Sequence, residues 1–192
     1  LHGQTALVTG TSSGLGLGVA KLLAKRGATL VVTARDASKC ASTLATLRGV
    51  APEAAITCAE LELESMAKVE AAAAELVSRV PTLDMLVLNA GIMAPPALEQ
   101  SADGLELQFH VNHLAQFWLV LRLLPALRRS SSPRVVTVSS IAHWMAPSAP
   151  LLSRAALNDA SAYDKVRWYG WSKLCNLLFA RELARREPSV RT

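Results

Sequence analysis

The sequence predicts an α/β fold in three layers, with a doubly wound parallel sheet covered by helices on both faces. Three observations support this prediction. Apolar runs of strand length alternate with amphipathic helical segments along the whole chain. The first apolar run leads directly into a glycine-rich turn and a helix start, and the other connections are short. With 192 residues and no internal repeat or linker, residues 1–192 are expected to form a single domain.

Five strand-helix units are expected in succession. The helices predicted at 15–26 and 66–80 carry their apolar residues on one helical face. The fifth predicted strand is apolar on both sides, as expected of a strand buried between two layers. Residues 190–192 resemble the opening of a sixth strand, so we expect the chain to be truncated near that point. The strands are predicted at 4–9, 28–34, 54–59, 83–88 and 134–138, and the remaining helices at 36–48, 103–127 and 164–186.

Composition excludes several classes of protein. Although 51% of the residues are hydrophobic, no stretch of about 18 uninterrupted apolar residues exists, so a membrane-spanning helix is not expected. The net charge of +5 comes from scattered basic residues, which argues against nucleic-acid binding. Because Leu1 is not an initiator methionine, we expect the natural N-terminus to be missing. Membrane association would then depend on missing segments.

Three cysteines, Cys40, Cys58 and Cys175, are far apart in the sequence. They have neither C-x-x-C spacing nor a histidine at metal-ligand spacing, so no metal site is predicted. We expect three buried free thiols and no disulfide. This favours a reducing intracellular compartment, either the cytoplasm or the cytosolic face of a membrane.

The turn at residues 9–16, T-G-T-S-S-G-L-G, predicts a site for an anion. Gly10, Gly14 and Gly16 carry no Cβ and permit positive φ, so a flat anionic group can lie against the backbone. The following helix presents its positive end there. The turn is therefore interpreted as a pyrophosphate cradle, with a plain turn as the alternative. The usual G-x-G-x-x-G pattern is absent because Val19 replaces its third glycine.

The end of the second predicted strand discriminates between dinucleotide cofactors. An acidic residue there would hold a ribose 2′-hydroxyl, whereas an arginine would accept a 2′-phosphate. The sequence gives Thr33-Ala34-Arg35, which favours NADP(H) over NAD(H); the alternative is that Arg35 is an ordinary surface residue. Asp36 is interpreted as the N-cap of the next helix.

The strongest chemical signal is the pair Tyr169 and Lys173, which lie on one face of a predicted helix. A phenol is ordinarily a poor base at neutral pH, so a neighbouring ammonium is needed to favour its phenolate. Ser140 follows the fifth strand and could donate to a carbonyl oxygen that Tyr169 protonates. Asn112 lies inside a predicted helix, where asparagine is unfavourable. Taken singly, these residues could be a chance spacing, a loop hydroxyl and a side chain bonded to backbone.

Together, Asn112, Ser140, Tyr169 and Lys173 resemble, in chain order, the four catalytic positions of the short-chain dehydrogenase/reductase family. The turn at 9–16 has the wider glycine spacing of that family, and the resemblance covers essentially the whole chain. Within that family, the sequence is most similar to the retinol dehydrogenase branch, and light-dependent protochlorophyllide reductases are similar too. The motifs that carry this closer likeness are residues 89–94, 103–104, 111–114 and 172–176.

The resemblance implies a Rossmann fold, bound NADP(H) and hydride transfer between a carbonyl and an alcohol on a small lipophilic substrate, such as a retinoid, a steroid or an aldehyde. Tyr169 would exchange the proton, Lys173 would support the phenolate and hold the nicotinamide ribose, and Ser140 would orient the substrate oxygen. Asn112 would maintain a water path behind Lys173. The implied cofactor-binding residues are Gly10, Ser12, Ser13, Gly14, Leu15, Gly16, Arg35, Glu62, Leu63, Asn89, Ala90, Gly91, Tyr169 and Lys173.

Two substitutions depart from the family pattern. Leu88 replaces the first asparagine of N-N-A-G, and Glu62 stands where an aspartate usually lies beside the adenine. Residues 141–162, with His143, Trp144 and Met145, are expected to form one wall of the substrate pocket.

Other readings of the same sequence stay open. The chain could belong to a light-dependent reductase of the protochlorophyllide type, or to a non-catalytic NADP-binding or scaffold protein. A homo-oligomer is also possible. If the chain is a fragment, it could bind cofactor without turnover, and we would then expect it to be poorly stable or to aggregate.

Overall fold

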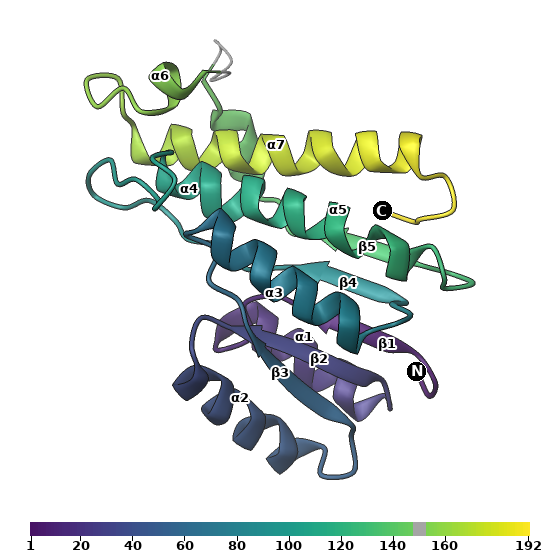
Figure 1. Ribbon diagram of the computed structural model, residues 1–192. Helices are drawn as coiled ribbons and strands as arrows, with labels where there is room; N and C mark the ends of the chain where they lie inside the picture. Colours follow the sequence, from purple (N-terminus) through teal and green to yellow (C-terminus); the bar gives the residue numbers. More distant parts are fainter. Residues whose placement is uncertain (148–152) are drawn as a thin grey trace.

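The computed structural model of the protein describes residues 1–147 and 153–192. At its centre is a five-stranded parallel sheet in the order β3-β2-β1-β4-β5 (Figure 1). The order reverses between β1 and β4, so the sheet is doubly wound as predicted from the sequence. The strands are β1 (Thr5–Val8), β2 (Thr29–Ala34), β3 (Ile56–Glu60), β4 (Met85–Leu88) and β5 (Arg134–Thr137).

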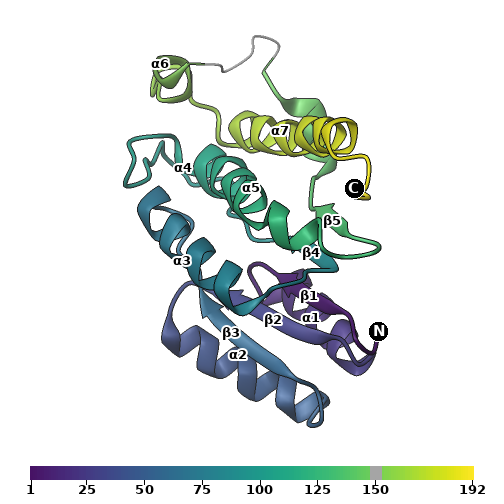
Figure 2. The same ribbon diagram turned by 45° about the vertical axis from the view of Figure 1, so that its right-hand side comes forward.

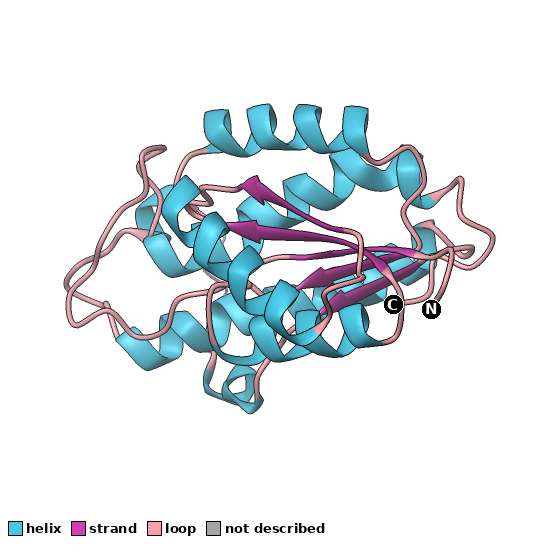
Figure 3. Cartoon of the chain, turned by 90° about the horizontal axis from the view of Figure 1, so that it is seen from below, coloured by secondary structure: helices cyan, strands magenta, loops and turns pink. Residues whose placement is uncertain are grey.

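Helices cover both faces of the sheet, which Figure 3 shows as a layer of strands between two helical layers. Helices α1 (Gly14–Lys25) and α2 (Ala37–Val50) lie on one face. On the other face lie α3 (Met66–Arg79), α5 (Ala115–Leu127) and α7 (Lys165–Arg186), which follow one another across the sheet in Figure 2. Short helices are α4 (Leu107–Phe109) and α6 (Arg154–Leu157). Within the described ranges, none of the helices is both long and apolar enough to cross a bilayer.

Alternation along the strands divides the core between the two faces. Leu7 packs with residues of α3 and α5, whereas its neighbours Ala6 and Val8 pack with α1 and α2. All three side chains are almost completely buried. The apolar strand runs of the sequence therefore correspond to strands covered on both sides.

The edge strand β5 differs from the prediction of full burial. Val135 is 1% exposed, but Val136 on the opposite face is 47% exposed. The cluster that packs under α1 and α2 includes residues of β1, β2, β3 and β4 but not Val136 of β5. Beside β5, the Val135 amide donates to the Arg191 carbonyl (2.8 Å), and the Arg191 amide donates to Pro133 (3.0 Å). This short parallel bridge lies where the sequence predicts the opening of a sixth strand.

The long helix expected at 103–127 begins later, at Leu107. The reason is Glu106, a fully buried N-cap whose carboxylate accepts from the amides of Gln108 (3.1 Å) and Phe109 (2.7 Å). Burial raises the pKa of Glu106. A π-helical turn, His110–Leu114, then separates α4 from α5. Such turns inside helices are frequent at functional sites, and this one contains the candidate residue Asn112.

The prediction of three free thiols is wrong, because Cys40 and Cys58 form a disulfide that joins α2 to β3. Their separation of 18 residues hides this proximity: the crossover returns the chain alongside β2, which brings the Cα atoms within 5.7 Å. Cys175 is free, and burial raises its pKa to about 12. The disulfide removes the argument from cysteine usage for a reducing compartment.

Candidate functional site

The glycine-rich turn lies at the carboxyl end of β1, beside the end of β4 where the strand order reverses. Gly10 has φ +68°, and a Cβ built on it would lie 2.7 Å from Ala90 Cα. Only glycine fits there, because the turn passes directly against the segment that follows β4. In open α/β sheets, this position is where ligands bind.

Hydrogen bonds tie the two segments together. The Thr9 hydroxyl oxygen accepts from the amides of Asn89 and Ala90, both at 3.0 Å. In return, the Asn89 side-chain amide donates to the carbonyls of Thr9 (3.0 Å) and Gly10 (3.1 Å). The ends of β1 and β4 therefore form one connected rim. Asn89 holds the glycine-rich turn against the end of β4 through these hydrogen bonds.

The N-terminus of α1 opens from this rim. Ser13 is its N-cap residue, but the Ser13 side chain accepts no hydrogen bond from the helix. The amides of the first turn are therefore available to an anion, which the helix dipole also favours. Gly16, in the same turn, leaves no room for a side chain, because its Cβ would lie 2.3 Å from the Asn89 amide nitrogen.

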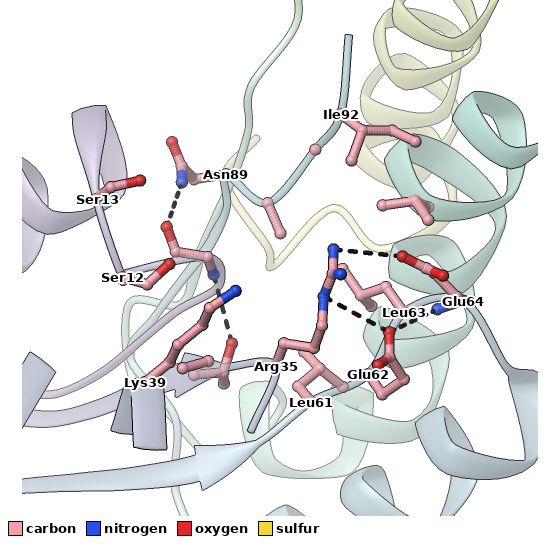
Figure 4. Close-up of a pocket in the computed structure, with 16 residues that line it drawn as sticks. Ser12, Ser13, Arg35, Lys39, Leu61, Glu62, Leu63, Glu64, Asn89 and Ile92 are labelled. Atoms are coloured by element: carbon pink, nitrogen blue, oxygen red, sulfur yellow. Dashed lines mark hydrogen bonds and ion pairs between the residues drawn. The ribbon is translucent and has the colours of Figure 1, made fainter. Parts of the chain in front are cut away.

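A cavity of about 260 Å³ extends from the rim along the ends of β2 and β3 (Figure 4). It brings together nine of the predicted cofactor-binding residues. It does not include Gly14, Leu15 or Gly16, nor the candidate pair Tyr169 and Lys173. The nine are Gly10, Ser12, Ser13, Arg35, Glu62, Leu63, Asn89, Ala90 and Gly91; further lining residues are Thr33, Ala34, Lys39, Leu61, Glu64, Ile92 and Val111.

The charged groups of the cavity lie at its β2–β3 end. Arg35 is held by two carboxylates, with Nη2 3.3 Å from Glu64 Oε1 and Nε 4.0 Å from Glu62 Oε1. Asp36 caps α2 as predicted by accepting from the Lys39 amide (2.8 Å), and this cap places Lys39 in the first turn of α2. Figure 4 shows the Arg35 and Lys39 side chains both extending into the cavity. The sequence reasoning overlooked Lys39 and Glu64, although the N-cap at Asp36 already put Lys39 at the same end of the helix as Arg35.

Lys173 lies deeper, behind the segment that follows β4. Lys173 is only 4% exposed, and its ammonium donates to the Val138 carbonyl (3.1 Å). Burial lowers the pKa of Lys173. The Nζ atom is 5.5 Å from the centre of the Tyr169 ring, so the predicted spacing does bring these side chains together. A Cβ on Gly91 would lie 3.7 Å from Nζ, which places Lys173 directly behind the cavity wall.

Ser140 follows β5 and begins the 3-10 turn Ile141–Met145. Its hydroxyl oxygen accepts from the Ala142 amide (3.2 Å), which leaves the hydroxyl proton available to another acceptor. This turn packs against α7 immediately beside Tyr169, since a Cβ on Gly170 would lie 2.4 Å from the Ala142 carbonyl oxygen. The neighbouring Ser139 instead donates to the Lys173 carbonyl (2.8 Å).

Asn112 connects two elements of the site. Its side chain makes a paired contact with the Ile92 backbone: Oδ1 accepts from the Ile92 amide (2.8 Å) and Nδ2 donates to the Ile92 carbonyl (2.9 Å). Nδ2 also donates to the Ser172 hydroxyl (3.0 Å), next to Lys173 on α7. The unfavourable helix position is thus explained by bonds to segments outside the helix. These bonds hold the β4 loop against α7.

The expected substrate wall at 141–162 is described in part, because residues 148–152 lie outside the described ranges. In the described part, Ile141 and Trp144 are 84% and 80% exposed, and Met145 is also exposed. These apolar side chains follow Ser140 directly in the chain. They flank the candidate catalytic residues without belonging to the cavity.

Similarity to solved structures supports the fold. A crystal structure of an uncharacterised protein from Mycobacterium paratuberculosis is 36% identical, with a TM-score of 0.84; the match covers 99% of this chain and 66% of that one. The active-site complex of Pseudomonas aeruginosa RhlG with NADP is 30% identical, with a TM-score of 0.76 and coverage of 99% and 69%.

Curated relatives are longer than this chain. Retinol dehydrogenase 14 of Mus musculus is 37% identical over 97% of this chain and 57% of its own length. The chloroplastic short-chain dehydrogenase TIC 32 B of Brassica napus is 34% identical over 95% and 58%, respectively. The chain therefore spans less than three fifths of the length of these relatives. The family described as short chain dehydrogenase matches residues 4–149. On this match and the similarity to retinol dehydrogenases, the chain belongs to the short-chain dehydrogenase family, in its retinol dehydrogenase-like branch.

Proposed function

We propose that this chain forms the cofactor-binding and catalytic part of an NADP(H)-dependent oxidoreductase that interconverts a carbonyl and an alcohol. The observation that carries the proposal is the buried ammonium of Lys173 beside the Tyr169 ring, directly behind Gly91 at the wall of the cavity. A buried amine next to a phenol, at the edge where open α/β sheets bind ligands, supports acid-base chemistry.

The glycines and the cations around the cavity support a dinucleotide as its ligand. Gly10 and Gly16 remove the side chains that would fill the turn, and the uncapped first turn of α1 suits a pyrophosphate. Arg35 and Lys39 offer cations at the far end, where a 2′-phosphate would lie. When bound, the nicotinamide supplies the hydride that reduces the carbonyl or accepts it from the alcohol.

The side chains then have separate tasks. In reduction, Tyr169 donates its phenolic proton to the substrate oxygen, and in oxidation its phenolate takes that proton back. The Lys173 ammonium stabilises the phenolate electrostatically. The Ser140 hydroxyl donates a hydrogen bond to the substrate oxygen and orients it. Asn112 holds the β4 loop and α7 in register, so that these groups face the cofactor.

A lipophilic substrate is supported by two observations. Several of the most similar curated relatives are named retinol dehydrogenases. In this chain, the exposed apolar side chains Ile141, Trp144 and Met145 follow Ser140. They offer an apolar surface beside the reacting groups.

Tyr169→Phe tests the catalytic assignment. Oxidation of NADPH is followed with retinal, steroid ketones and small aldehydes, in the dark, and NADPH binding is measured by fluorescence. We expect turnover to fall by at least about 10²-fold while NADPH still binds, because only the proton donor is lost. Tyr163→Phe is the matched control, because it removes the hydroxyl of the other tyrosine, which bonds to Gln108 and Pro95. The turnover of this variant should stay within a few fold of wild type. Full activity of Tyr169→Phe would refute the assignment.

The preference for NADP(H) is tested at Arg35 and Lys39. A charge-assisted bond to phosphate contributes about 1.5–3 kcal/mol, so Arg35→Ala and Lys39→Ala should each raise the KM for NADPH about tenfold or more and leave the KM for NADH unchanged. Lys68→Ala, an exposed lysine of α3 outside the cavity, is the control. Equal effects on both cofactors would show that neither cation contacts a 2′-phosphate.

A further inference from the structure

We propose that Asn176, oriented by His113, is a positioning residue for the Lys173 ammonium. This inference rests on the proposed function of Lys173 as the cation that stabilises the Tyr169 phenolate. The cofactor and catalytic residues inferred from the sequence include neither Asn176 nor His113. Both belong to a buried hydrogen-bond network on the side of Lys173 that faces the protein interior.

The network centres on the Val138 carbonyl oxygen, which follows β5. Lys173 Nζ donates to this oxygen at 3.1 Å, and Asn176 Nδ2 contacts the same oxygen at 3.4 Å. Asn176 lies three residues after Lys173 on α7, so the two side chains emerge on the same face of the helix. Asn176 is 3% exposed, and its amide also donates to the Asn112 carbonyl (3.0 Å). The acceptor that fixes the ammonium is therefore itself held by Asn176.

His113 fixes which way the Asn176 carboxamide points. With Nδ2 directed at two carbonyl oxygens, Oδ1 faces His113 Nδ1 at 3.0 Å. A carboxamide oxygen only accepts, so His113 must donate from Nδ1. Burial lowers the pKa of His113, which favours the neutral ring, and the contact with Asn176 Oδ1 places the ring proton on Nδ1. The ring lies among three phenylalanines that limit its rotation: Phe109, Phe117 and Phe179.

The Asn112 carbonyl oxygen accepts from a second side chain as well. Gln116 Nε2 donates to it at 3.0 Å, in addition to Asn176 Nδ2 at the same distance. A carbonyl oxygen has two lone pairs, and side-chain amides use both of them. Asn176 therefore connects the Asn112 carbonyl to the carbonyl that holds Lys173.

The Tyr169 phenolate reports the position of the ammonium without cofactor or substrate. The chain has two tyrosines, and burial raises the pKa of Tyr163 to about 12, so the titration is recorded in a Tyr163→Phe background, in which Tyr169 is the only source of phenolate absorbance. Tyr169→Phe checks this assignment, and Lys173→Met gives the midpoint without any ammonium. If Asn176→Leu lets the ammonium retreat by about 1 Å from its distance of 5.5 Å to the Tyr169 ring centre, Coulomb's law at an effective dielectric of about 20 predicts a midpoint about 0.3 pH units higher.

Gln116→Leu is the matched control. It removes a buried carboxamide that donates to the same Asn112 carbonyl but is not bonded to Val138, so it should lower stability without moving the midpoint. His113→Leu, which suits the aromatic surroundings, should shift the midpoint in the same direction by a smaller amount. It replaces Asn176→Leu as the deciding variant if that protein does not fold.

The turnover of the same variants separates this inference from the proposed function. We expect Asn176→Leu to lower kcat by up to about 10²-fold, as a misplaced catalytic group does, and to shift the pH profile of kcat with the phenolate midpoint. A wild-type midpoint and pH profile in the folded deciding variant would overturn the positioning role, even if Tyr169→Phe and Lys173→Met are inactive. Full activity of those two variants would instead overturn the proposed function.

Discussion

Alanine substitutions in and after the glycine-rich turn separate the two reasons for which glycine is needed there. Gly10 requires both a positive φ of +68° and the absence of a Cβ, which would lie 2.7 Å from Ala90 Cα. Gly14 requires only a positive φ of +57°, because nothing lies within 4 Å of its Cβ position. Gly18 has neither requirement and lies on the exposed side of α1. The three positions thus form an internal series.

The expected free energies of unfolding follow from these differences. A left-handed conformation costs a non-glycine residue about 1–2 kcal/mol, and an overpacked contact adds about 1–3 kcal/mol. Gly10→Ala should therefore destabilise by about 2–5 kcal/mol and Gly14→Ala by about 1–2 kcal/mol. Gly18→Ala should stabilise by about 0.5–1 kcal/mol, because alanine favours a helix over glycine.

Urea denaturation followed by circular dichroism measures all three variants, and NADPH fluorescence gives their cofactor affinity. Gly10→Ala should also bind NADPH more weakly, because the turn has to move away from Ala90. If Gly10→Ala were no less stable than Gly14→Ala, the close approach of the turn to the β4 segment would be refuted. The interpretation of the turn as a pyrophosphate cradle would then fail too.

Three further predictions concern buried and cross-linked side chains. Because burial lowers the pKa of Lys173, its charged form opposes folding below the unfolded pKa; Lys173→Met should raise the urea midpoint at pH 7 while abolishing turnover. Because burial raises the pKa of Glu106, the contribution of its protonated form to stability is present at low pH and is lost as pH rises through the folded pKa. Glu106→Gln should therefore increase the free energy of unfolding more at pH 8 than at pH 5. The Cys40–Cys58 disulfide closes a loop of 18 residues, so Cys40→Ser should lower the free energy of unfolding by about 3 kcal/mol. Dithiothreitol should destabilise wild type and Cys175→Ser, which keep the disulfide, but should leave the stability of Cys40→Ser unchanged.

Local sequence signals were sufficient for the doubly wound parallel sheet and for most of the cavity. The strands formed within one or two residues of their predicted bounds because apolar runs, glycine turns and caps such as Asp36 agree with one another. Gly10, Arg35 and Asn89 could be assigned to one site because the carboxyl ends of parallel strands meet at one edge of a sheet. Tyr169 and Lys173 could be paired because helical periodicity is local.

The features that escaped prediction depend on contacts between distant segments. Helical periodicity extended the helix to Asp103, whose carboxylate instead accepts from the Met66 amide 37 residues away. The Cys40–Cys58 bond depends on the path of a crossover, and the exposure of Val136 depends on which helices lie above β5. Periodicity and spacing describe neighbours along the chain, so they contain no information on these long-range contacts.

The mutual bonds of Thr9 and Asn89 have a thermodynamic consequence for ligand capture. The ends of β1 and β4 are fixed to each other by four hydrogen bonds between protein atoms. Little backbone freedom is left to lose when a dinucleotide arrives, so the entropic cost of binding falls mainly on the ligand and on long side chains such as Lys39. Association at this rim should therefore resemble entry into a preformed slot.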